Sequence, residues 1–211
     1  MTDKPRRGRP PKTTAEDWER AALDAVAAGG VAAVSVEALA AGLGATKGSF
    51  YWHFANREAL IAAALRRWEV EHTEMLAGYL ETVADPMERL RYTLPGALAD
   101  ERGSAVALTL LADAADPEVG AAIARVTARR VGLLERAFTD LGFDQRRARM
   151  RAQAAYAVYL GTAALRRGAP ESAPEADADY ATEVLEMLSG VSGVSGEVRA
   201  ASAPRQDGLR K

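Results

Sequence analysis

One short stretch of this chain, KGSFYWHF at residues 47–54, gathers side chains suited to contact with nucleic acid. Lys47 can donate to guanine O6 or N7, or it can instead bind a phosphate. Gly48 has no side chain, which permits close approach of the backbone to a duplex. Trp52 can pack on thymine methyl groups. We interpret this stretch as a DNA-reading element, with Lys47 and Ser49 near its start, where base edges are met.

The residues around this stretch predict two short helices joined by a tight turn. Ser35 can cap the first helix. The apolar residues that follow recur at i, i+3, i+4 and i+7: Val36, Leu39, Ala40 and Leu43. Gly44 stands where this helix stops, because only glycine enters the left-handed conformation cheaply. Thr46 can cap the second helix and Asn56 a third. Helix, glycine turn, helix is the helix-turn-helix pattern, whose second helix reads DNA.

A longer helix should precede this pair. Thr14, with Asp17 three residues later, is a partial capping box, and Gly29-Gly30 ends the helix. Trp18 suits the core better than a base or ligand contact. Phe50 and Phe54, four residues apart, should also face inward.

The stretch from Trp18 to Leu60 resembles the TetR family of transcriptional regulators. The motifs that carry the resemblance are Leu39-Ala40, Gly44, Thr46, Lys47-Gly48-Ser49-Phe50-Tyr51-x-His53-Phe54 and Asn56-Arg57-Glu58-x-Leu60. The resemblance implies that Tyr51 and His53 position a phosphate. It also implies that Arg57 contacts a phosphate at the start of the next helix.

Glu37 departs from the family's pattern, in which a base-contacting arginine or a neutral polar residue is common. Its carboxylate can accept from cytosine N4. Alternatively, it only favours the positive end of its helix and touches nothing. We prefer the second interpretation.

The first thirteen residues form a basic, proline-rich arm without periodicity. The core of the arm, Arg7-Gly8-Arg9-Pro10, matches the tract that AT-hook segments place in an A·T-rich minor groove. Arginines enter such a narrow, electronegative groove from an extended backbone. A solubilising tail is the alternative, and we favour groove contact by Arg7 and Arg9.

Composition restricts the class of protein. Three-four apolar spacing and abundant alanine predict an all-α fold. The chain has no cysteine and only two histidines, and no nucleophile stands beside a base in a known motif. We therefore expect no enzyme, no metal site and no cofactor. No apolar run approaches the ~20 residues of a membrane span, so we expect a cytoplasmic protein.

Charge is distributed unevenly along the chain. The net charge is −2, but residues 1–58 hold eight basic against seven acidic side chains. The remainder is therefore acidic, which disfavours indiscriminate binding of polyanions.

The predicted organisation has four parts. A flexible arm (1–13) precedes a helix-turn-helix domain (14–55), a ligand-binding and dimerisation domain (56–190) and a tail without a core pattern (191–211). The helix after Asn56 should continue unbroken to Asp85-Pro86. Later helices are expected at 86–99, 104–114, 117–141, 144–167 and 175–188, with Gly103 as a break.

The family resemblance implies that the last two helices form a homodimer. Candidate interface residues are Ala155, Tyr159, Val184, Met187 and Leu188. It also implies a small-molecule pocket among the middle helices. Candidate lining residues are Tyr92, Leu108, Leu111, Met150 and Tyr156, with a filled core as the alternative. The identity of the ligand cannot be predicted.

These features predict a homodimeric repressor that binds palindromic double-stranded DNA and is released by a small molecule. Activation instead of repression depends on operator position, which the protein sequence does not record. A ligand-independent architectural protein that binds A·T-rich DNA is the alternative.

Overall fold

The computed structural model describes residues 12–175 and 178–190. All regular structure in these ranges is helical, which confirms the all-α prediction. The helices of the first half are α1 (Ala15–Gly29), α2 (Val36–Gly42), α3 (Lys47–His53), α4 (Arg57–Glu69), α5 (Met75–Thr82) and α6 (Pro86–Ala99). Those of the second half are α7 (Glu101–Ala112), α8 (Pro117–Asp140), α9 (Gln145–Gly168) and α10 (Ala178–Ser189). Short turns are η1 (Val31–Ala33), η2 (Val70–Glu74) and η3 (Pro170–Ser172).

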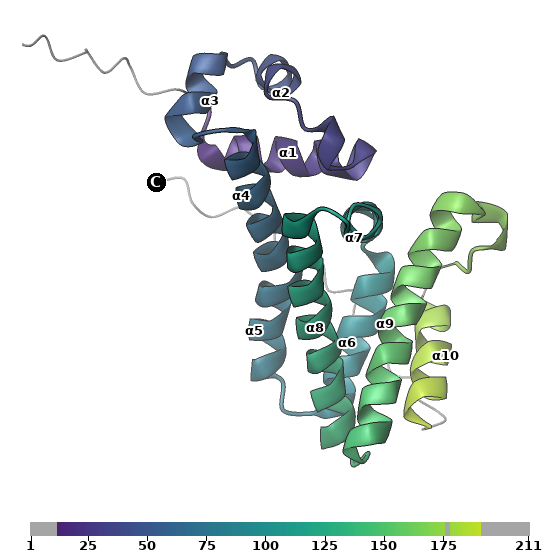
Figure 1. Ribbon diagram of the computed structural model, residues 1–211. Coiled ribbons are helices and arrows are strands. Elements are labelled where there is room, and N and C mark those ends of the chain that lie inside the picture. Colours follow the sequence, from purple (N-terminus) through teal and green to yellow (C-terminus); the bar gives the residue numbers. More distant parts are fainter. Residues whose placement is uncertain (1–11, 176–177, 191–211) are drawn as a thin grey trace, which may run out of the picture. The chain divides into compact units, whose positions relative to one another are not determined.

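The chain divides into two compact units (Figure 1). The first, which we call the head unit, runs to His72 and includes Thr109–Ala124. The second, the bundle unit, contains Thr73–Leu108 and the described residues from Arg125 onward.

Helix starts in the head unit follow the predicted caps. The Thr14 hydroxyl accepts from the Asp17 N–H, and the Asp17 carboxylate accepts from the Thr14 N–H, which completes a capping box. Ser35, Thr46 and Asn56 each accept a backbone N–H three residues on. Each cap satisfies a donor that the helix itself cannot pair.

The core of the head unit is built on α1 and α4. Trp18 is fully buried, and its ring meets Phe50 edge-on with 5.4 Å between centroids. Phe54 stacks on Phe50 at 5.7 Å. The prediction that these three rings form the core is confirmed, and they determine which side of α3 is left outside.

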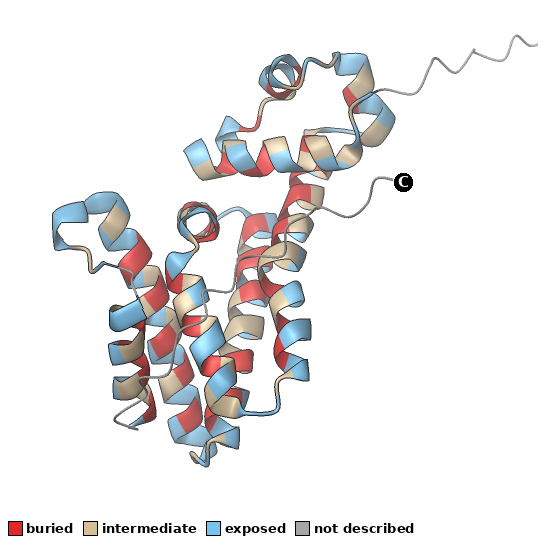
Figure 2. Ribbon diagram, turned by 180° about the vertical axis from the view of Figure 1, so that it is seen from behind, coloured by how far each residue is buried: buried red, intermediate tan, exposed pale blue. Residues whose placement is uncertain are grey.

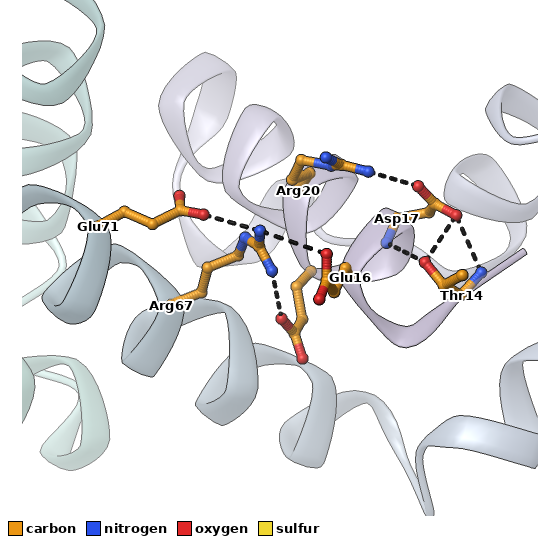
Figure 3. Close-up of polar contacts among 7 residues, drawn as sticks. Thr14, Glu16, Asp17, Arg20, Arg67 and Glu71 are labelled. Atoms are coloured by element: carbon orange, nitrogen blue, oxygen red, sulfur yellow. Dashed lines mark hydrogen bonds and ion pairs between the residues drawn. The ribbon is translucent and has the colours of Figure 1, made fainter. Parts of the chain in front are cut away.

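An ion cluster also ties α1 to α4 (Figure 3). Arg67 of α4 donates to Glu19 at 3.1 Å and lies 2.7 Å from Glu71 and 3.8 Å from Glu16. Burial by itself would lower the pKa of Arg67, but these carboxylates raise it overall. The guanidinium is therefore held as a charged link between the two helices.

The helix expected after Asn56 runs without a break from Arg57 to Thr82, but residues 70–74 are π-helical instead of α-helical. This segment, η2, is a π-helical stretch that joins α4 directly to α5. Its Thr73 is fully buried, and the Thr73 hydroxyl accepts from Arg130 Nε at 3.0 Å. The wider turn carries a polar side chain inward, where a residue of α8 pairs with it.

The bundle unit packs α6, α8, α9 and α10 side by side, with the buried residues in stripes along facing sides (Figures 1 and 2). The residues that form its central core are Leu90, Leu94, Leu134, Ala137, Phe138, Ala148, Ala152, Ala155 and Leu185. Gly103 does not break a helix as expected. It lies in the first turn of α7, where its N–H is capped by the Asp100 carboxylate at 2.8 Å. No described helix is long and apolar enough to cross a membrane.

Candidate nucleic-acid interface

The outward side of α3 carries large and charged groups with little protein contact. Tyr51 is 64% exposed and Trp52 is 51% exposed. Lys47 is also exposed, and the inward side of the same helix holds Phe50. Exposed aromatic rings on a rigidly anchored helix form a surface that is available to a partner molecule. This surface matches the reading element predicted from the sequence.

Packing within the protein does not require a glycine at position 48. A Cβ built on Gly48 would meet only the Thr46 hydroxyl, at 3.6 Å, which is ordinary contact. The fold therefore has room for a side chain here, and the free space lies outside the protein.

Ser49 is placed differently from the expectation of an open base contact. Its backbone N–H donates to the Thr46 cap at 3.2 Å. Its hydroxyl oxygen is buried and has no hydrogen-bond partner in the described structure. Contact between this hydroxyl and a base therefore requires the side chain to rotate, and the role stays a prediction.

His53 joins the end of α3 to the residues before α1. Its Nε2 lies 2.8 Å from the Thr13 carbonyl oxygen. A carbonyl only accepts, so Nε2 carries the proton. This contact places the start of the described chain beside α3. The predicted minor-groove residues Arg7 and Arg9 lie outside the described residues.

Arg57 has a structural role that sequence reasoning missed. Its Nε donates to the Val34 carbonyl at 2.7 Å, and its Nη2 donates to the Val31 carbonyl. The guanidinium thereby holds the turn between α1 and α2. Its Nη1 lies 3.9 Å from a Glu58 oxygen. Phosphate contact by Arg57 stays a prediction.

The same turn is held from the far side of the sequence by Asp113. The Asp113 carboxylate accepts from the Val31 N–H at 2.8 Å. Gly30 has φ 74°, and a Cβ there would lie 2.5 Å from an Asp113 oxygen. Asp113, just after α7, is therefore part of the head unit. No local sequence pattern predicts its contact with the turn.

Our preferred interpretation was that Glu37 touches nothing, but its side chain contacts Lys47. Its Oε1 lies 2.5 Å from Lys47 Nζ, which joins α2 to α3 across the helix-turn-helix. The Ser35 hydroxyl donates to the other oxygen at 3.3 Å. Pairing with Lys47 lowers the pKa of Glu37 and raises that of Lys47.

The family model for bacterial regulatory proteins of the tetR family matches residues 20–64, which run from α1 into α4. The N-terminal segment 20–64 of this chain therefore belongs to the TetR family of bacterial regulatory proteins. No curated protein sequence matches the chain.

Solved structures share the TetR fold along most of the chain. One is a transcriptional regulator from Rhodococcus sp. Rha1, with 24% identity and a TM-score of 0.67, covering 84% of this chain and 95% of that one. FadR from Bacillus subtilis, in complex with stearoyl-CoA, has 18% identity and a TM-score of 0.65, covering 84% and 100%. A regulator from Saccharomonospora viridis in complex with choline has 18% identity and a TM-score of 0.68, covering 82% and 94%.

The bundle unit contains a pocket of about 200 Å³. Its lining residues are Leu80, Glu81, Arg89, Leu90, Thr93, Leu133, Leu134, Arg136 and Ala137. None of our five candidate lining residues is among them. Tyr92 and Met150 are 36% and 56% exposed, and the Tyr156 hydroxyl lies 3.2 Å from that of Thr127. Met150 lines a different pocket, of about 350 Å³, with Asp144, Arg146, Arg147 and Arg151. Leu108 and Leu111 are half-buried on α7, and a ligand-binding role stays a prediction for all five residues.

The candidate dimer residues divide into two groups. Ala155, Tyr159 and Val184 are buried inside their own chain, because α9 and α10 turn them toward the bundle core. Met187 is 67% exposed and Leu188 is half-buried. Only the second group is placed where another chain can reach it, and its contact with a partner stays a prediction.

Proposed function

We propose that this TetR-family regulator is a homodimeric repressor that leaves a palindromic operator when a small molecule binds. The observation that carries the proposal is the outward surface of α3. There Lys47, Gly48, Tyr51 and Trp52 are exposed on a helix whose other side is fixed by buried aromatic rings. A helix seated in the major groove needs such a surface.

The outer side of α9 supports the homodimer. Its exposed residues include a run of small side chains: Ala154, Ala157, Gly161 and Ala164. Leu165 is 41% exposed at one end of this run, and Met187 is exposed on α10. Small residues let helices approach closely, and a two-fold axis there would pair each helix with its copy. A two-fold dimer reads a palindrome, with half-sites about 34–36 Å apart.

The pocket beside Leu90 supports control by a small molecule. At about 200 Å³ it is smaller than the ~300–1,000 Å³ usual for ligand sites, and we expect a bound effector to widen it. An effector that prefers the widened bundle would shift the population toward a form with lower operator affinity. The solved relatives that hold stearoyl-CoA and choline show that this fold accepts ligands of very different size.

The proposal is tested by selecting fragments of the source genome with the purified protein and sequencing the enriched DNA. We expect one inverted repeat, bound by two chains. A ligand found from the neighbouring genes should then lower the affinity for that repeat. Diffuse A·T-rich enrichment without a repeat would refute the dimeric repressor and favour an architectural protein.

A further inference from the structure

We propose that Glu37 and Lys47 act together as one reader of a single G·C base pair in each half-site and distinguish it from C·G. The inference rests on the proposed function, because it requires α3 to lie in the major groove. It assigns Glu37 a role in specificity and gives the ion pair between α2 and α3 a purpose.

The first argument is the position of the pair. Both side chains belong to the helix-turn-helix, and they remain 64% and 58% exposed although they contact each other. Exposed ion pairs contribute little to stability, so the fold gains little from this one. Lys47 lies at the same helix start as Gly48, where the backbone leaves room for a duplex.

The second argument is that the pair is held in a defined orientation. Glu37 Oε1 forms an ion pair with Lys47 Nζ at 2.5 Å, and Oε2 accepts a hydrogen bond from the Ser35 hydroxyl at 3.3 Å. Ser35 is itself fixed as the cap of α2, where it accepts from the Ala38 N–H. After these bonds, the ammonium still has two protons to donate, and each carboxylate oxygen keeps a free lone pair.

The third argument is complementarity with base edges. In the major groove a G·C pair presents two acceptors, N7 and O6, on the guanine side and one donor, N4, on the cytosine side. An ammonium beside a carboxylate is complementary to this edge, because the ammonium can donate to guanine and the carboxylate can accept from cytosine N4. Guanine O6 and cytosine N4 are Watson–Crick partners about 2.9 Å apart, close to the 2.5 Å between Lys47 Nζ and Glu37 Oε1.

Orientation follows from the same order. Turning the base pair to C·G places the N4 donor against Lys47 and the guanine acceptors against Glu37, so both contacts become repulsive. An A·T pair presents acceptor, donor and acceptor in a symmetric order. The ion pair therefore cannot distinguish A·T from T·A. Lys47 alone would bind either a guanine or a phosphate. Glu37 beside it restricts recognition to one orientation of the base pair.

The test compares the sequences selected by the wild type, Glu37→Gln, Lys47→Met and the exchanged double variant (Glu37→Lys with Lys47→Glu). Glu88→Gln is the matched control, since Glu88 is an exposed acid on α6 of the bundle unit. Thermal unfolding of each variant should remain near that of the wild type. Binding is then measured on the selected operator with each of the four base pairs at the assigned position.

We expect the wild type to prefer G·C over C·G by roughly 5- to 150-fold at one position per half-site. Both single variants should reduce this ratio to less than about threefold at that same position. The exchanged variant should prefer C·G, while Glu88→Gln should select the wild-type sequence.

Three results would overturn the inference and leave the proposed function intact. The single variants would change different positions, or neither would change any position. Alternatively, Glu37→Gln would strengthen binding to all sequences equally, which would make Glu37 only an electrostatic mask over Lys47. If the wild type selects no inverted repeat at all, the proposed function fails and the paired reader fails with it.

Discussion

Gly48→Ala should make the protein more stable and its DNA binding weaker. Alanine favours a helix interior over glycine by about 0.5–1 kcal/mol. Gly48 is the second residue of the seven-residue α3, so we expect the lower part of that range. The new methyl group meets only the Thr46 hydroxyl, at 3.6 Å, and no clash offsets the gain. At about 2–4 °C per kcal/mol for a chain of this size, Tm should rise by about 1–2 °C.

The same methyl group should obstruct the duplex. If the α3 backbone approaches the DNA closely at Gly48, an added methyl group overpacks that interface at a cost of about 1–3 kcal/mol. This corresponds to a roughly 5- to 150-fold loss of operator affinity, measured by titration at fixed salt. Opposite signs in the two measurements separate a contact with DNA from a defect in folding.

The matched control is Gly78→Ala in α5. Gly78 is also an exposed helical glycine, and a Cβ there has nothing within 4 Å. This variant should gain similar stability and bind the operator as the wild type does. If Gly48→Ala raises Tm and leaves the affinity within twofold, the backbone of α3 does not approach DNA at this residue, and the reading surface is misplaced.

Three further predictions follow from the contacts of the head unit. Hydrogen bonds from Thr14 and an ion pair with Arg20 lower the pKa of Asp17 from 3.8 to about 2, so its contribution to stability is present above about pH 4 and is lost as the pH falls through 2. The difference in unfolding free energy between wild type and Asp17→Asn should therefore shrink between pH 5 and pH 2, and a constant difference would contradict this assignment. Asp113→Ala should lower the unfolding free energy by about 1–3 kcal/mol, because the part-buried Val31 N–H loses its acceptor, whereas Asp113→Asn, which keeps an acceptor, should lose less in the same denaturant titration. Arg57→Met should lower both Tm and operator affinity, because two carbonyls lose their donor; an unchanged Tm with weaker binding would reduce Arg57 to a phosphate contact.

Prediction from the sequence succeeded where an interaction is local. Thr14, Ser35, Thr46 and Asn56 each find their backbone partner three residues away. Gly44 adopts φ 60°, as a glycine after a helix should. Local steric and hydrogen-bonding rules suffice for these features, because no other part of the chain takes part in them.

Prediction failed where a partner is distant or where packing decides. The sequence predicted a continuous helix here but neither the π-helical form of residues 70–74 nor the hydrogen bond to Thr73 from Arg130, which lies 57 residues away. The sequence offered Ala155 and Val184 as dimer candidates, because small and apolar residues suit either a helix contact within the chain or one between chains. Their burial shows that the bundle itself uses them.

The sequence by itself determined the all-α fold, the helix-turn-helix and the residues that α3 turns outward, because caps, glycines and apolar spacing act over one or two helical turns. Tertiary structure alone decided what those residues meet. Folding brings Asp113 to Val31 across 82 residues, turns Arg57 onto the carbonyls of the α1–α2 turn, and places Glu37 against Lys47. These pairings depend on how helices cross, and chain order carries no direct record of that geometry.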